Sequence, residues 1–336
     1  MRTPVSLVTG AGGEIGHGLV TTMARAGRAL VTIDLQPLDA TLRPLVVREF
    51  VGSVMDTNLL ERVLAEFEVE MVVHLAALLS TRSEFTPVAA HQVNVDGTLN
   101  LLEFAQREGE SHGYPVRFLY PSSVAVFGLP DLETKRRVGP VSEEAWNTPH
   151  TMYGCNKLYC EHLGRYYARH YKQLAAQALG MVDFRCVRFP GLISAMTTPS
   201  GGTSDYASEL IHASAQGVPY ACFVRPDTRI PFMAMPDAVD ALARLAETPR
   251  SQLTRTAYNL TAFSPTALEM YDIVTAAFPA AAVTWRTDVK RQRIVDSWPE
   301  DMDDAAARSD WGWAPGYDLR RAFEAYVIPA IRERYR

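Results

Sequence analysis

The sequence predicts an α/β protein built on a doubly wound parallel sheet, with a smaller C-terminal α+β lobe. A short apolar run at residues 5–9 is followed by a glycine-rich turn. Apolar residues at three- and four-residue spacing come next, which is the pattern of a strand, a turn and an amphipathic helix. Apolar runs and helical patterns then alternate. Strands that are apolar on both sides are typical of parallel sheets covered by helices on both faces.

The alternation assigns the remaining segments in order. Further strands are expected at 29–33, 46–50, 71–75, 116–120 and 181–189, and helices at 57–67, 86–108 and 151–173. The second half is less regular. A glycine- and hydroxyl-rich loop at 199–204 is expected to cap a helix that ends near residue 215. Further helices are expected at 236–247, 265–278 and 318–334, and a strand at 257–260. We therefore expect a Rossmann domain at residues 1–193, to which 228–260 return, and a mainly substrate-binding lobe at 194–336.

Composition limits the function classes. The chain has 336 residues, 47% of them hydrophobic, so it is long enough to form a sizeable core. Its net charge of -5 argues weakly against nucleic acid as the main partner. No apolar run approaches the ~20 residues that a bilayer requires. The 4 cysteines include no CxxC pair, so no structural metal is expected. With no leader-like segment recognised, we expect a cytoplasmic protein without membrane contact.

Three glycines between the first strand and the first helix predict a dinucleotide site. Gly10 allows the tight turn, Gly13 lets backbone amides approach a pyrophosphate, and Gly16 lets the helix pack on the strand. Asp34 follows the second strand, where a carboxylate would bind ribose hydroxyls and repel a 2′-phosphate. NAD is therefore favoured over NADP. The alternatives are a glycine-rich turn without a ligand and an aspartate that only faces solvent.

Tyr153 and Lys157 are the predicted acid–base pair. Their i,i+4 spacing places the phenol and the ammonium on one face of the expected helix. A nearby ammonium and a positive nicotinamide ring would both favour the phenolate. Ser122 and Ser123 close an earlier strand at the carboxyl edge, where doubly wound sheets bind their ligands. Without these serines, the tyrosine and lysine would be read as an ordinary surface pair.

Several blocks resemble the extended short-chain dehydrogenase/reductase family, in that family's order. The blocks are VTGAGGEIG at 8–16, HLAA at 74–77, Asn94 with Gly97 and Thr98, PSSVAVFG at 121–128, and Tyr153 with Lys157. Phe127 stands where many members carry tyrosine, and Ser53 and Val54 replace the pair of an aspartate and a hydrophobic residue that often contacts the adenine. The resemblance implies NAD as cofactor and Ser123, Tyr153 and Lys157 as the catalytic residues.

The same resemblance implies a set of cofactor contacts along the first 193 residues. They are Gly10, Gly13, Glu14, Ile15, Gly16, Asp34, Leu35, Ser53, Val54, Leu75, Ala76, Ala77, Asn94, Tyr153, Lys157, Pro190 and Leu192.

Blocks in the second half resemble the threonine dehydrogenase branch of this family. They are RFPGLIS at 188–194, GGTSDYA at 201–207, DSWP at 296–299 and the pattern from Asp303 to Trp313. This resemblance implies oxidation of the L-threonine 3-hydroxyl to 2-amino-3-ketobutyrate, with Ser80, Ser123, Tyr153, Thr203 and Trp298 contacting the substrate. Ser80 and Thr203 are also compatible with loop and helix-cap roles, and Trp298 with packing of the lobe.

Other function classes stay open on the same scaffold. A nucleotide-sugar epimerase or dehydratase would keep its NAD bound, and a regulator would bind NAD without catalysis. The long helices at 86–108 and 151–173 suggest a homodimer, as in many relatives. His74 is expected to be a satisfied core histidine, and 135–137 (KRR) a solvated charged loop.

Overall fold

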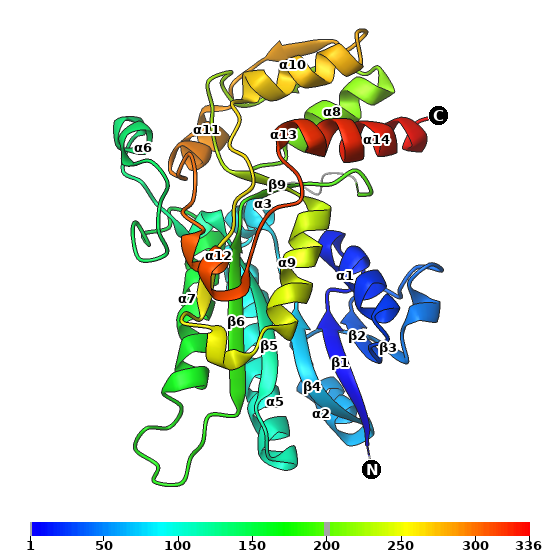
Figure 1. Cartoon of the computed structure of the whole chain (residues 1–336), viewed down its shortest axis with the longest axis vertical. Coiled ribbons are helices and arrows are strands. Elements are labelled where there is room, and N and C mark those ends of the chain that lie inside the picture. Colours follow the sequence, from blue (N-terminus) through cyan, green and yellow to red (C-terminus); the bar gives the residue numbers. More distant parts are fainter. Residues whose placement is uncertain (1, 198–201) are drawn as a thin grey trace.

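The computed structural model, which describes residues 2–197 and 202–336, contains a seven-stranded parallel sheet (Figure 1). Part of the predicted loop at 199–204 lies outside the described residues. The strands run in the order β10-β6-β5-β4-β1-β2-β3. Their bounds are β1 Thr3–Thr9, β2 Leu30–Asp34, β3 Arg48–Val51, β4 Phe67–His74, β5 Val116–Ser123, β6 Val182–Phe189 and β10 Ala257–Asn259. The order reverses between β1 and β4, so a ligand crevice is expected at their carboxyl ends.

Helices cover both faces of the sheet. One face carries α1 (Glu14–Arg25) and α9 (Met235–Glu247), and the other carries α2 (Thr57–Glu66), α5 (Gly97–His112) and α7 (Met152–Arg169). Val8 and Val73 belong to the core on the α1 side, whereas Leu7 and Val72 belong to the core on the α2 and α5 side. Burial on both faces explains why the strand sequences read as nearly continuous apolar runs.

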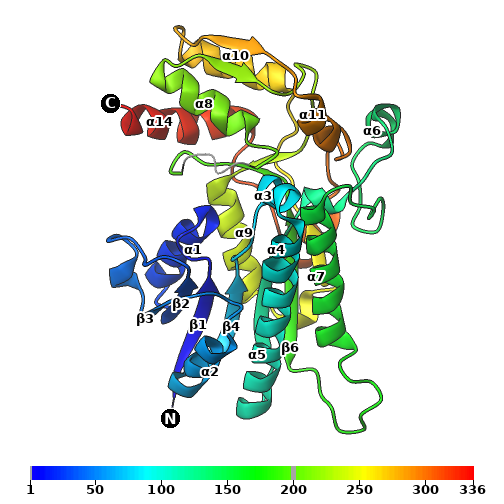
Figure 2. The same cartoon turned by 180° about the vertical axis from the view of Figure 1, so that it is seen from behind.

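A third core holds the C-terminal lobe together above the carboxyl edge of the sheet (Figure 2). Two small parallel pairs, β7 with β9 and β8 with β11, lie among its helices. The remaining elements are η1 Arg43–Leu45, α3 Ser80–Phe85, α4 Pro87–His91, η2 Gln92–Asp96, η3 Val124–Val126, α6 Leu132–Val138, β7 Gly191–Ile193, α8 Tyr206–Gln216, β8 Tyr220–Cys222, β9 Phe232–Ala234, η4 Arg250–Gln252, α10 Ala267–Ala277, β11 Val283–Trp285, α11 Val289–Asp296, α12 Ala305–Trp311, α13 Leu319–Arg321, η5 Ala322–Val327 and α14 Ile328–Arg334.

The second half of the chain returns to the sheet. Strand β10 pairs in parallel with β6, and α9 packs against α1. These contacts are compatible with the expected return of 228–260 to the first domain, whose boundary stays a prediction. Among the described residues, no helix combines the length and apolar character that crossing a bilayer requires.

Two local features differ from the sequence expectations. The helix expected at 86–108 is interrupted by a π-helical turn, η2, which carries Asn94. Residues 135–137 lie on helix α6, so the prediction of a loop is wrong for all three, and Lys135 is only 2% exposed, so it is not solvated either. Its ammonium donates a 2.9 Å hydrogen bond to the carbonyl oxygen of Val295 on α11. That partner lies 160 residues away, so no local pattern could reveal it. Arg136 and Arg137 are exposed, as expected.

Candidate active site

The turn between β1 and α1 is too tightly packed for side chains. Gly10 has a φ of +68°, and a Cβ atom there would lie 2.7 Å from the backbone nitrogen of Ala76. A Cβ on Gly16 would lie 2.5 Å from the carbonyl oxygens of Gly10 and Ala11. The turn is therefore pressed against the residues that follow β4, and only glycine fits at either position.

The first turn of α1 faces this crevice without a side-chain cap. Gly13 is the N-cap residue and makes no side-chain hydrogen bond to the helix. Backbone N–H groups and the positive end of the helix dipole are therefore presented at the carboxyl edge of the sheet, which favours an anionic group there.

Asp34 ends β2 beside the same turn. Its Oδ2 accepts a hydrogen bond from the backbone nitrogen of Gly12 at 3.0 Å, and its Oδ1 accepts one from Gln36 at 3.3 Å. The carboxylate is thus held at the strand tip, and neighbouring Leu35 is exposed. Val54 is buried, whereas the Ser53 hydroxyl accepts a hydrogen bond from the backbone of Met55.

Asn94 braces the loop after β4. Its Oδ1 accepts from the backbone nitrogen of Leu78 at 2.8 Å, and its Nδ2 donates to the Leu78 carbonyl at 3.1 Å. The oxygen and the nitrogen of the amide are therefore both hydrogen-bonded to the backbone of Leu78, which directly follows Leu75, Ala76 and Ala77. Direct contact of this side chain with the cofactor stays a prediction.

Close backbone contact brings the turn after Ser123 next to the first turn of α7. The Ser123 hydroxyl accepts a hydrogen bond from Ala125, at the start of η3. Thr151 caps α7 by accepting from the backbone nitrogen of Gly154 at 3.0 Å. A Cβ on Gly154 would lie 2.0 Å from the Ala125 carbonyl oxygen, so α7 can begin here only with glycine at this position. Tyr153, the preceding residue, is thereby held near the predicted catalytic serine.

Lys157 lies one helical turn beyond Tyr153, as the spacing predicted, and is buried. Its Nζ donates a 2.7 Å hydrogen bond to the carbonyl oxygen of Pro121, and lies 4.5 Å from the ring centroid of Tyr120 and 5.5 Å from that of Tyr153. Burial lowers the pKa of Lys157 to about 8. The ammonium therefore sits between the end of β5 and the phenol that it is predicted to assist.

Burial raises the pKa of the Tyr153 phenol above its ordinary value in the cofactor-free chain. This differs from the expectation of an acidic phenol, because loss of hydration outweighs the nearby ammonium. The buried tyrosine therefore favours its protonated form at neutral pH.

A buried ion pair fixes α7 against β6. Arg188 on β6 contacts both carboxylate oxygens of Glu161 on α7, at 2.9 Å through Nε and 2.6 Å through Nη2. The Nη1 group of Arg188 donates to the Glu143 carbonyl at 2.9 Å. Glu161 is one turn beyond Lys157, so the pair sets the rotation of the helix that carries the acid–base residues. The sequence analysis missed it, although an arginine within an apolar strand was the signal.

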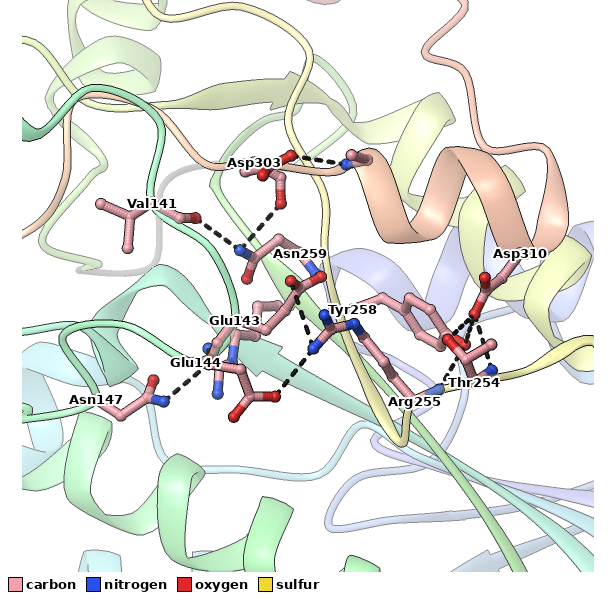
Figure 3. A network of polar contacts seen from close by, with 12 residues as sticks. Val141, Glu143, Glu144, Asn147, Thr254, Arg255, Tyr258, Asn259, Asp303 and Asp310 are labelled. Carbon is pink, nitrogen blue, oxygen red and sulfur yellow. Dashed lines mark hydrogen bonds and ion pairs between the residues drawn. The ribbon is translucent and has the colours of Figure 1, made fainter.

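The Glu143 segment is part of a larger polar network (Figure 3). Its carboxylate accepts from the backbone of Asn259 at 3.1 Å, and Arg255 binds the neighbouring Glu144 at 2.9 Å. A polar cavity of about 320 Å³ adjoins this network and is lined by residues of α7, β6 and β10. The cavity does not include the predicted catalytic residues. Among the described residues, no group of three or more His, Cys, Asp or Glu side chains could hold a metal ion.

Two of the predicted substrate residues meet in the structure. The Oγ of Ser80, at the start of α3, accepts hydrogen bonds from the backbone nitrogen of Thr203 at 3.1 Å and from its hydroxyl at 3.2 Å. Trp298 is buried in the core of the C-terminal lobe, which favours the packing interpretation. Pro190 and Leu192 follow β6 at the same edge of the sheet. Substrate contact by these residues stays a prediction.

The family model described as "NAD dependent epimerase/dehydratase family" matches residues 6–261. The chain belongs to this family. It is also 33% identical, over 93% of its length and 79% of the relative's, to a Bos taurus protein named "L-threonine 3-dehydrogenase, mitochondrial".

Two solved structures are similar over nearly the whole chain. A monomeric L-threonine 3-dehydrogenase from a metagenome is 32% identical with a TM-score of 0.86, covering 99% of this chain and 100% of that one. The holo form of a GalE-like L-threonine dehydrogenase from Cupriavidus necator is 32% identical with a TM-score of 0.84, with the same coverage.

The crevice of this epimerase/dehydratase family member fits NAD. The turn can form only because Gly10 and Gly16 carry no Cβ atoms. The start of α1 has no side-chain cap, so its backbone N–H groups suit a pyrophosphate. Asp34 would bind the adenosine ribose, and no lysine or arginine at positions 35–38 would offset repulsion of a 2′-phosphate.

Replacing Asp34 with alanine should weaken NAD binding. Loss of hydrogen bonds to a charged acceptor costs about 1.5–3 kcal/mol, which corresponds to roughly a ten- to hundredfold rise in the Kd for NADH. Fluorescence titration measures this change. Asp131→Ala is the matched control, because the exposed Asp131 carboxylate accepts a 2.7 Å hydrogen bond from the backbone nitrogen of Thr134 at the start of α6. An equal loss in both variants, or better use of NADP than NAD by the wild type, would contradict the role of Asp34.

Proposed function

We propose that the protein oxidises the 3-hydroxyl of L-threonine to give 2-amino-3-ketobutyrate, with NAD as the hydride acceptor. The observation that carries this proposal is the contact between Gly154 and Ala125, which brings the turn of Tyr153 beside the turn of Ser123. The names of the bovine and metagenomic relatives support threonine as the substrate. Deprotonation of an alcohol by a tyrosine base fits this arrangement, with NAD as the oxidant.

The proposal gives each of the three catalytic residues a defined role. Ser123 orients the substrate hydroxyl by hydrogen bonding. The Tyr153 phenolate takes the hydroxyl proton, and the Lys157 ammonium stabilises the phenolate and holds the nicotinamide ribose. NAD, when bound, accepts the hydride that leaves the β-carbon as the carbonyl forms. One proton and one hydride therefore leave the substrate, which balances a two-electron oxidation.

Ser80 and Thr203 are proposed to bind the amino-acid end. They already contact each other, so hydroxyl groups from α3 and from the second lobe meet at one place. Ser80 Oγ accepts from Thr203, which leaves the Ser80 proton for a substrate carboxylate. The buried indole of Trp298 would form an apolar wall of the site against the substrate methyl group, on the side of the C-terminal lobe.

An epimerase or dehydratase is the second candidate, because the family includes both reactions. The two functions differ in net cofactor reduction. A threonine dehydrogenase releases NADH during turnover, whereas an epimerase recycles its NAD and shows no net change in absorbance at 340 nm. Steady-state absorbance with threonine and NAD therefore tests the proposal. The intact Ser123, Tyr153 and Lys157 set argues against a non-enzymatic NAD-binding regulator.

Tyr153→Phe should lower kcat by at least about 10²-fold, because general-base catalysis contributes roughly 10²–10⁴-fold. The ring and its packing are retained, so the Kd for NADH should change little. Steady-state kinetics and NADH titration measure the two effects separately. Turnover near that of the wild type would rule out Tyr153 as the base.

Activity should rise with pH from about 6.5 to about 8 and then flatten. The deprotonated phenol is the active form, and burial raises the pKa of Tyr153, so each rise in pH populates more of the base. Burial also lowers the pKa of Lys157 to about 8, so the assisting charge declines above that pH. A profile of kcat/KM against pH measures both limbs. Activity that falls over the lower range would contradict this assignment.

We further propose a cytoplasmic homodimer. Tyr159 and Tyr166 lie seven residues apart on α7 and are 54% and 40% exposed, and Leu99 is exposed on α5. Helices α5 and α7 lie side by side (Figure 2). Large exposed apolar side chains on adjacent helices favour helix packing between two copies. The four cysteines form no disulfide, which fits a reducing compartment. The metagenomic neighbour, however, is named monomeric, and the bovine relative mitochondrial.

Tyr159→Glu should convert the dimer to a monomer of 37.2 kDa, because a charge would be buried at the contact. Size-exclusion chromatography with light scattering measures the mass. Leu174→Glu is the control, since Leu174 is fully exposed in the loop after α7. A wild-type protein that is already monomeric would overturn the dimer proposal.

A further inference from the structure

His74 lies at the end of β4 and is hydrogen-bonded through both ring nitrogens. Its side chain is only 1% exposed. Nδ1 lies 2.8 Å from the hydroxyl of Thr9 on β1, and Nε2 lies 3.0 Å from the hydroxyl of Thr98 on α5. The expectation of a satisfied core histidine is confirmed. These two hydrogen bonds, however, connect His74 to residues beside the predicted cofactor and substrate sites.

Only one arrangement of protons satisfies the whole chain of contacts. The Thr98 hydroxyl donates to the Asn94 carbonyl at 2.6 Å, so it must accept from Nε2–H of His74. Nδ1 is then the acceptor of a hydrogen bond from the Thr9 hydroxyl, whose oxygen accepts from the backbone nitrogen of Ala76 at 3.3 Å. Burial and the charge of Lys157 lower the pKa of His74 to about 3, so the ring is neutral during turnover.

The Thr9 side of this chain ends at the cofactor turn. Thr9 directly precedes Gly10, and Ala76 is the residue that a Cβ on Gly10 would strike. The hydrogen bond from Ala76 to Thr9 therefore joins the two backbone segments whose close approach forms the turn. We call Thr9 and Ala76 the cofactor arm.

The Thr98 side ends near the predicted substrate residues. Thr98 holds the carbonyl of Asn94 within the π-helical turn, and the Asn94 side chain holds both backbone groups of Leu78. Leu78 lies two residues before Ser80, which contacts Thr203. We call Thr98 and Asn94 the substrate arm.

We propose that His74 is a positioning residue, which through its Nε2–H tautomer ties the cofactor turn to the turn that carries Ser80. Desolvating an imidazole disfavours folding unless both nitrogens are paired, so an apolar side chain would suit a purely structural role at this position. The substrate arm of this inference rests on the proposed function. The cofactor arm does not, because it concerns NAD binding alone.

Isosteric valine variants separate the two arms. Thr9→Val should raise the Kd for NADH about tenfold, since displacement of a binding group by ~1 Å can cost up to ~10²-fold. Thr98→Val should raise the KM for threonine by a similar factor and change the Kd for NADH less than Thr9→Val does. Thr228→Val is the matched control: its hydroxyl is also buried and bonded, to Gln292 in the C-terminal lobe, at a distance in sequence from both arms. The thermal midpoint of each variant reports general destabilisation.

Two replacements of His74 retain one arm each. The amide of asparagine reaches only as far as Nδ1, so His74→Asn can still accept from Thr9 but cannot reach Thr98. The longer glutamine side chain places its NH₂ near the position of Nε2, so His74→Gln can still donate to Thr98. We expect His74→Asn to raise mainly the KM for threonine and His74→Gln to raise mainly the Kd for NADH. General destabilisation would move both readouts in the same direction.

The outcomes decide the inference. It is overturned if Thr9→Val and His74→Gln change the Kd for NADH by no more than Thr228→Val does, whatever their thermal midpoints. It is also overturned in its substrate arm if Thr98→Val and His74→Asn leave the KM for threonine unchanged. A wild-type protein that binds NADH but forms none from threonine would contradict the proposed function instead, and NADH titration would then still decide the cofactor arm.

Discussion

The buried ammonium of Lys157 is the constraint on which the site depends. A charge removed from water needs close partners, and Lys157 finds them in the Pro121 carbonyl and the faces of two tyrosine rings. These partners exist only if α7 begins at the carboxyl end of β5. Gly154 permits that approach, and the buried ion pair of Arg188 and Glu161 fixes the orientation of α7 about its own axis. Catalytic geometry is thus a consequence of how one helix is anchored.

Close backbone contacts serve the cofactor side of the crevice in the same way. Gly10 and Gly16 let the β1–α1 turn lie against Ala76 and against its own carbonyls, where any side chain would collide. Parallel strands align their carboxyl ends, so this turn, Asp34 and the end of β5 share one edge without any long loop to bring them together. The hydrogen bonds of His74 cross that edge between β1, β4 and α5.

The sequence predicted what local spacing determines and missed what distant contacts determine. The alternation of strands and helices, the glycine turn and the Tyr153–Lys157 spacing follow from short-range patterns, and the structure contains a parallel sheet, that turn and that helix as expected. The burial of Lys135 depends on a carbonyl 160 residues away. The hydrogen bonds of the Asn94 side chain to the Leu78 backbone depend on a π-helical turn, which has no periodic signature in the sequence. Arg188 was visible as a charge in an apolar strand, but its partner on α7 was not.

The acid–base pair shows why burial and charge have to be considered together. Burial disfavours both the ammonium of Lys157 and the phenolate of Tyr153, since each is a charge in a poorly hydrated place. Lys157 Nζ lies 5.5 Å from the Tyr153 ring centroid, and opposite charges at that separation attract by about 3 kcal/mol at an effective dielectric constant of ~20, which is worth ~2 pKa units. This attraction exists only when the phenolate forms, so the lysine offsets part of the rise that burial causes. The positive ring of an oxidised nicotinamide bound beside the phenol would lower the pKa of Tyr153 further, and would favour the base in the form that the reaction needs.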